Sequence, residues 1–128
     1  MKSLTQIYEI HAPIADVWVA LVDPKMINHW GGGPAKMDAK TGTKFSLWGG
    51  DIHGTNTKVI PQKLLEQDWY GGDWEKPSKV IFRLASGSSG KTNVTLTQTD
   101  IPDGEFVDIE EGWKRFYMGP LKKLVEKK

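Results

Sequence analysis

The sequence predicts an α+β domain with a curved antiparallel sheet of six to seven strands, two short helices and one long C-terminal helix packed across the sheet. Apolar residues recur with helical spacing over residues 105–128, and they alternate with polar residues over most of residues 35–100. Short turns separate the alternating runs, which favours an antiparallel meander. Two proline-marked helical stretches between the first strand and this meander complete the pattern.

Composition narrows the class of protein. The chain has 128 residues and is expected to form one domain, residues 1–128. Seventeen basic and 16 acidic residues give a net charge of +1, which argues against nucleic acid as a partner. With no cysteine there is neither a disulfide framework nor thiolate chemistry. No leader or membrane-spanning stretch is apparent, so no membrane partner and a cytoplasmic location are expected.

The N-terminal part begins with an alternating run, Thr5–Ile10, that predicts a strand. Pro13 then suits the first turn of a helix whose apolar stripe extends to Val22. Asp23 followed by Pro24 predicts an N-cap and the first position of a second helix, which should end at the glycines of residues 31–34.

The middle of the chain predicts strands joined by tight turns. Gly49-Gly50 is a strong hairpin signal, and Pro61-Gln62 and Gly87–Gly90 mark further turns. The expected strands cover residues 35–39, 45–47, 51–60, 63–69, 80–84 and 94–99.

The C-terminal helix has a broad apolar face that carries several aromatic rings. Gly119-Pro120 interrupts it, and proline cannot donate a hydrogen bond to the preceding turn. Two helical segments are therefore expected, at about 105–118 and 121–127, with a joint between them. The face comprises Phe106, Ile109, Trp113, Phe116, Tyr117, Leu121 and Leu124.

A sheet covered by one long helix can enclose a cavity. The aromatic residues facing it could instead fill a solid core, but Gln67 and Gln98 lie on otherwise apolar strand faces. Because a buried amide needs a partner, these residues favour a partly hydrated pocket for a small hydrophobic or aromatic ligand. The expected lining set is Phe45, Leu65, Gln67, Trp69, Phe82, Gln98, Trp113, Phe116 and Tyr117.

No catalytic or metal-binding pattern stands out. His11, His29 and His53 do not form a zinc motif, although Asp51 shares a strand face with His53. The serines of residues 86–89 lie in a flexible turn and lack a nucleophile elbow. We therefore expect no catalytic residues, no metal, no cofactor and no enzymatic activity.

Six short stretches together are typical of one protein family: Ala12–Trp18, Gly42–Phe45, Gly49–Gly54, Ile60–Trp69, Ile101-Pro102 and, most specifically, Gly112–Tyr117. They resemble the C-terminal domain of the activator of heat shock protein 90 ATPase homologues, in the SRPBCC superfamily (Bet v 1/START-like). The co-chaperone of that name has a further N-terminal domain with no counterpart in this sequence. The resemblance implies the helix-grip fold.

Two functions are open on these grounds. The cavity favours a binding module for a small apolar molecule, whereas the resemblance implies a heat-shock chaperone as partner, modulation of its ATPase and a role in stress response. Trp48 and Trp74 are expected to be exposed, which would fit a protein-binding surface. Some helix-grip proteins are similar to cyclases or aromatases, but nothing here pairs an acid with a base.

Overall fold

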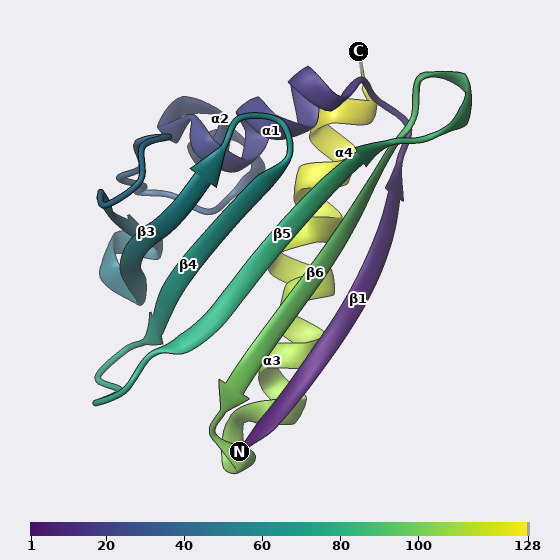
Figure 1. Ribbon diagram of the computed structural model, residues 1–128. Coiled ribbons are helices and arrows are strands. Elements are labelled where there is room, and N and C mark those ends of the chain that lie inside the picture. The colour runs from purple at the N-terminus through teal and green to yellow at the C-terminus, as the bar shows by residue number, and fades with distance from the viewer. Residues whose placement is uncertain (128) are drawn as a thin grey trace.

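The computed structural model, described over residues 1–127, forms one antiparallel sheet with a long C-terminal helix lying across one of its faces (Figure 1). Strand order is β1-β6-β5-β4-β3-β2, so the predicted meander runs from β2 to β6, and β1 pairs with β6. This is the expected helix-grip fold. The strands are β1 (Lys2–Ile10), β2 (Lys44–Leu47), β3 (Ile52–Ile60), β4 (Leu64–Gly71), β5 (Ser78–Ser86) and β6 (Thr92–Ile101).

The two short helices, α1 (Ile14–Val22) and α2 (Pro24–Trp30), lie at one end of the sheet (Figure 1). The predicted cap is confirmed: the Asp23 carboxylate accepts a hydrogen bond from the Lys25 backbone N–H at 3.0 Å, and Pro24 occupies the first turn. Gly31 ends α2 in the left-handed conformation, with φ of 106°. Short 3₁₀ turns occur at Trp48–Gly50, Ser88–Gly90 and Asp103–Glu105.

The expected strand at residues 35–39 is wrong. Only a single bridge, between Lys36 and Ser46, joins this segment to the sheet, so the sheet has six strands. The reason lies at Asp38, whose carbonyl oxygen accepts hydrogen bonds from the side chains of Thr43 and Asn56, both at 3.0 Å. A carbonyl occupied in this way does not serve a strand ladder.

The long helix changes its hydrogen-bond pattern along its length but continues without a gap. It consists of α3 (Phe106–Gly112), a π-helical segment (Trp113–Met118) and α4 (Gly119–Glu126). The Gly119 N–H donates to the Lys114 carbonyl, five residues back, and that oxygen lies too close to leave room for a Cβ on Gly119. Pro120 falls in the first turn of α4, a position that tolerates proline. The joint is therefore a π turn over residues 113–118, which precedes the Gly119-Pro120 position at which it was expected.

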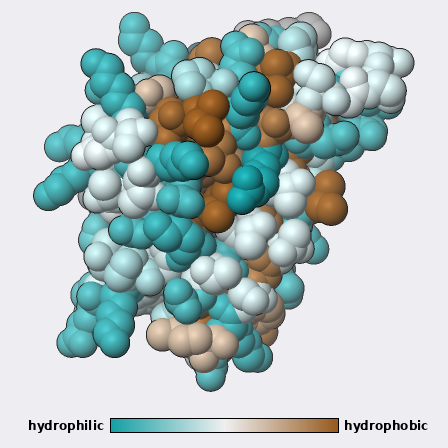
Figure 2. All heavy atoms as spheres, in the orientation of Figure 1, coloured by the Kyte–Doolittle hydropathy of each residue, from teal (hydrophilic) through white to brown (hydrophobic). Residues whose placement is uncertain are grey.

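The core lies between the sheet and the long helix. Leu65, Phe82 and Leu96 from the sheet are fully buried, as are Met118 and Leu121 from the helix. The opposite face of the sheet, which Figure 2 presents, is covered mainly by hydrophilic side chains with separate apolar patches. Within residues 1–127, no helix has the length and apolar character needed to cross a membrane.

Glu126 connects the end of α4 to the segment after β1, and we expect this contact to be pH-sensitive. Its carboxylate accepts the His11 backbone N–H at 2.8 Å and pairs with Lys122. These two hydrogen bonds, that from His11 first, hold the pKa of Glu126 below its ordinary value of 4.5. The ionised form thus stabilises the fold above the ordinary pKa, and this contribution is lost as pH falls through the lowered pKa.

Glu126→Gln should therefore unfold more easily than the wild type at neutral pH, by about 0.5–1 kcal/mol for a partly screened contact. The difference should shrink below the ordinary carboxyl pKa of 4.5. Urea denaturation across this pH range measures it, with the exposed Glu75→Gln as control. A difference that stays constant into acid would contradict the assignment.

Candidate functional site

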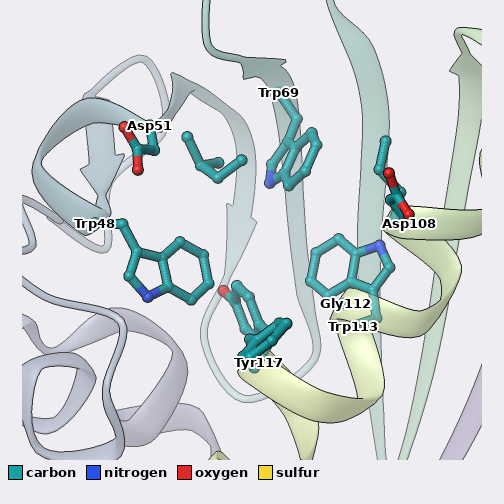
Figure 3. A pocket seen from close by; sticks show the side chains of 10 residues that line it. Trp48, Asp51, Trp69, Asp108, Gly112, Trp113 and Tyr117 are labelled. Carbon is teal, nitrogen blue, oxygen red and sulfur yellow. The ribbon is translucent and has the colours of Figure 1, made fainter. Parts of the chain in front are cut away.

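An open pocket of about 360 Å³ lies between the sheet and the long helix, beside the π-helical segment (Figure 3). One wall comes from the β2–β3 connection and from β4, and the other from α3 and the π turn. Its lining is largely aromatic. The lining residues are Trp48, Asp51, Ile52, Trp69, Asp108, Ile109, Gly112, Trp113, Phe116 and Tyr117.

The aromatic rings are packed against one another, so the pocket has rigid walls. Trp113 lies 5.6 Å from Trp69 in a stacked arrangement and 4.7 Å from Tyr117, measured between ring centroids. Trp48 meets Tyr117 edge-on at 6.1 Å. Such contacts stabilise ring positions beyond the burial of area alone, which makes this a preformed site.

A glycine widens the pocket on the helix side. Gly112 has helical backbone angles, with φ of −59° and ψ of −37°, and lines the pocket directly. No atom of the described chain lies within 4 Å of the position of an added Cβ. The absence of a side chain at Gly112 thus leaves room next to Trp113.

Two buried hydrogen-bond donors in the pocket lining have no partner. The Trp69 and Tyr117 side chains are 6% and 2% exposed, and neither the indole Nε1 nor the hydroxyl has an acceptor among residues 1–127. In Figure 3 both polar atoms are directed into the space between the rings. Burial raises the pKa of Tyr117 above its ordinary value, so the hydroxyl keeps its proton at neutral pH.

The amides that suggested a hydrated pocket are instead bonded to the protein. Gln67 donates to the Asn56 side chain at 3.0 Å. Gln98 accepts the Trp113 indole N–H at 2.7 Å and donates to the Ser78 hydroxyl at 3.0 Å. The expectation that they line the cavity is corrected: both are buried in the core, and Gln98 fixes the orientation of Trp113.

The expected lining set was too wide in other places as well. Phe45, Leu65 and Phe82 are buried in the closed core and do not reach the pocket. Phe116 does line the pocket, but its side chain is 62% exposed at the rim rather than enclosed. The π turn explains this, since it changes the angular spacing of the helix and turns Tyr117 inward in place of Phe116.

Trp48 and Trp74 are not exposed as expected; both are half-buried. The Trp48 indole N–H donates to the Gly31 carbonyl at 2.8 Å, and its ring forms part of the pocket. The Trp74 ring packs edge-on against Trp69 at 5.8 Å. Asp51 and Asp108, which sequence reasoning did not assign to the site, also line the pocket.

The described residues contain no group of three or more histidine, cysteine or acidic side chains arranged to hold a metal ion. His53 instead stacks on Tyr70 at 5.2 Å, and its Nε2 lies 2.8 Å from the Gly72 carbonyl. These contacts give His53 a structural role in the β3–β4 pair.

Removing the Gln98 side-chain amide should destabilise the aromatic wall. Gln98→Leu keeps the volume but leaves the Trp113 indole N–H without an acceptor, at a cost of about 1–3 kcal/mol. Chemical denaturation measures this loss. The exposed Gln62→Leu serves as control, and a Gln98→Leu protein as stable as the wild type would contradict the structural role.

Comparisons with known proteins agree with one another. A family model described as "Activator of Hsp90 ATPase homolog 1-like protein" matches residues 11–126. An activator of 90 kDa heat shock protein ATPase homolog from Dictyostelium discoideum is 40% identical over 63% of this chain and 22% of its own length. Homolog 1 from Homo sapiens is 27% identical over 70% of this chain and 27% of its own length. The chain thus spans about a quarter of the curated relatives that it matches.

The fold also has a counterpart among solved structures. The crystal structure of an HSP90 activator from Plasmodium falciparum superimposes with a TM-score of 0.90 and 24% identity. The match covers 97% of this chain and 96% of that one. This likeness supports the helix-grip fold.

Proposed function

The chain belongs to the family of activator of Hsp90 ATPase homolog 1-like proteins, and from this premise we propose that it is a binding module for a small apolar or aromatic molecule. The observation that carries the proposal is the pocket of about 360 Å³ lined by Trp48, Trp69, Trp113 and Tyr117. Ligand sites are typically concave, mostly apolar and largely preformed, with a few polar groups that orient the ligand.

We propose further that the module is not an enzyme. The titratable side chains of the pocket are Asp51, Asp108 and Tyr117, and no histidine, lysine or arginine is among its described lining residues. The two carboxylates come from opposite walls, as Figure 3 shows. The Tyr117 hydroxyl has no hydrogen-bond partner among residues 1–127, so it is not paired with an adjacent base in the way that most activated nucleophiles are. A cytoplasmic location remains part of the same proposal.

Titration with flat apolar probes tests the ligand-binding proposal. Fluorene and naphthalene should quench tryptophan fluorescence saturably, with one molecule bound per chain, because three tryptophan rings line the pocket. Ile7→Thr, which changes an exposed apolar side chain on β1 outside the lining, should leave the affinity unchanged. Quenching that rises linearly without saturation for every probe would overturn the proposal.

A second candidate is interaction with a heat-shock chaperone. The observation that favours it is the 40% identity to the Dictyostelium protein, whose name describes activation of a 90 kDa heat shock protein ATPase. The surface of α3 also exposes an apolar side chain, Val107, that is 69% exposed. In this candidate the chain would bind the chaperone and modulate its ATPase under stress.

The ATPase rate of the host's 90 kDa heat shock protein, measured with and without this chain, tests the second candidate. Stimulation that weakens in Val107→Ser would support it, because that exposed side chain contributes little to the fold. An unchanged ATPase rate at saturating chain concentration would count against it.

A further inference from the structure

We propose that the pocket receives a neutral, flat aromatic molecule bearing a carbonyl-type oxygen, and that the Trp69 indole N–H and the Tyr117 hydroxyl both donate hydrogen bonds to this oxygen. The inference rests on the proposed ligand-binding function and adds the chemical class of the ligand.

The first support is that two unpaired donors line the same pocket. Trp69 Nε1 and Tyr117 Oη have no acceptor within residues 1–127, although both side chains are more than nine-tenths buried. Buried donors without an acceptor are unfavourable, and the great majority in native proteins are paired. A carbonyl oxygen has two lone pairs and can accept from both at once.

The second support is that three other indoles of the aromatic cluster donate to acceptors within the protein. Trp113 donates to Gln98 at 2.7 Å, Trp30 to the Ala20 carbonyl at 2.8 Å and Trp48 to the Gly31 carbonyl at 2.8 Å. The buried indole N–H of Trp69 departs from this pattern, and the Trp69 ring forms part of the pocket lining (Figure 3). An acceptor supplied by a ligand accounts for the difference.

The charges of the side chains that line the pocket favour a neutral acceptor group on the ligand over an anionic one. Asp51 and Asp108 line the pocket, and no cationic side chain does so among the described residues. A carboxylate or phosphate would meet these two negative charges without compensation, so a neutral oxygen is favoured. A cation would be attracted by the aromatic faces and by the two carboxylates. It would, however, be repelled by the partial positive charge on the Trp69 indole N–H and the Tyr117 hydroxyl hydrogen.

The walls indicate a flat ligand. Trp69 and Trp113 are stacked with 30° between their planes, and Trp48 meets Tyr117 at 70°. These rings already contact one another, and a flat aromatic ligand can extend the same stacked or edge-on contacts into the pocket that they line.

Two probes of nearly equal shape test the assignment. Fluorenone carries a carbonyl oxygen that fluorene lacks, so the wild type should bind fluorenone roughly tenfold or more tightly than fluorene if both donors pair with it. The carbonyl stretching frequency of bound fluorenone should lie below that of fluorenone in an apolar solvent, because hydrogen bonding weakens the bond. Fluorene-carboxylate and benzyltrimethylammonium test the charge argument, and both should bind more weakly than fluorenone.

Two variants then remove one donor each. Tyr117→Phe and Trp69→Phe should each lower the preference for fluorenone severalfold and shift its carbonyl stretch toward the free value. Tyr117→Phe should keep its affinity for fluorene, and without ligand it should be at least as stable as the wild type, since it removes an unpaired buried hydroxyl. The matched control is Tyr70→Phe, whose half-buried side chain lies outside the pocket lining.

The outcomes separate the two proposals. Equal binding of fluorene and fluorenone, unchanged in Tyr117→Phe, would overturn the donor assignment and leave the ligand-binding function standing. Tighter binding of either charged probe would overturn the assignment as well. If neither fluorene nor fluorenone binds, the proposed function itself fails and this inference falls with it.

Discussion

Gly112→Met should abolish binding of fluorene and fluorenone, lowering the affinity roughly a hundredfold or more, while the protein stays folded. The methionine side chain would start from a helical position beside Trp113 and extend into the pocket. Because no described atom lies within 4 Å of the added Cβ, the substitution fills ligand space without a clash at its first atom. Methionine also favours a helix over glycine by about 0.5–1 kcal/mol.

Calorimetric titration and thermal unfolding of the same sample measure both effects. The matched control is Gly104→Met, because this exposed glycine also has open space around an added Cβ but lies outside the pocket lining. It should bind both probes with wild-type affinity. Undiminished binding by Gly112→Met would place the probe somewhere else on the protein.

Gly54→Ala should cause the largest loss of stability among single-methyl additions, about 2–3 kcal/mol or more. An added Cβ would overlap the Asp68 backbone carbonyl and come within 3.0 Å of the Phe45 ring. Gly54 lies opposite Trp69 in the β3–β4 ladder, so the strand cannot move away without disturbing that pairing. Glycine is needed here for close backbone approach.

Urea denaturation provides the comparison, with Gly112→Ala as control. The same chemical change at Gly112 should stabilise the protein by about 0.4–1 kcal/mol, since its backbone is helical and its surroundings are open. We therefore expect the free energy of unfolding to fall in Gly54→Ala and to rise in Gly112→Ala. A destabilisation at Gly54 no larger than a few tenths of a kcal/mol would show that the β3–β4 spacing relaxes easily.

Much of the fold could be predicted because local signals agreed with the global arrangement. The pair Asp23-Pro24 correctly predicted where α2 begins. The alternation of apolar and polar residues predicted which face of each strand is turned toward the core. Residues 35–39 were wrongly predicted to form a strand because apolar and polar residues do alternate there. In the structure, the side chains of Thr43 and Asn56 donate hydrogen bonds to the Asp38 carbonyl instead. The bond from Asn56 joins residues 18 positions apart in the chain, so it leaves no local pattern in the sequence.

The long helix shows a second limit. Gly119-Pro120 correctly indicated an irregularity, but an α-helical wheel assigns Phe116 and Tyr117 to one face. The π turn separates them, leaving Phe116 exposed at the rim and Tyr117 buried. Periodicity analysis assumes one repeat along the helix, so a change of repeat is invisible to it.

The site could be predicted only in part. Trp69, Trp113, Phe116 and Tyr117 were expected near the cavity and do line the pocket. Gln67 and Gln98 were recognised as unusual, but their partners depend on strand register and on the reach of Trp113. The contribution of Trp48 depends on how the β2–β3 connection folds back toward the helix, which no spacing in the sequence encodes.

We expect a ligand in the aromatic pocket to form hydrogen bonds with Trp69 and Tyr117. Two-dimensional proton–nitrogen NMR of the six tryptophan indole N–H groups, recorded during a fluorenone titration, tests it most directly. We predict that the Trp69 indole resonance moves furthest and saturates, whereas that of Trp113, already bonded to Gln98, moves less. A Trp69 resonance that stays in place while the ligand saturates, or that moves no further than those of tryptophans outside the pocket, would contradict the account.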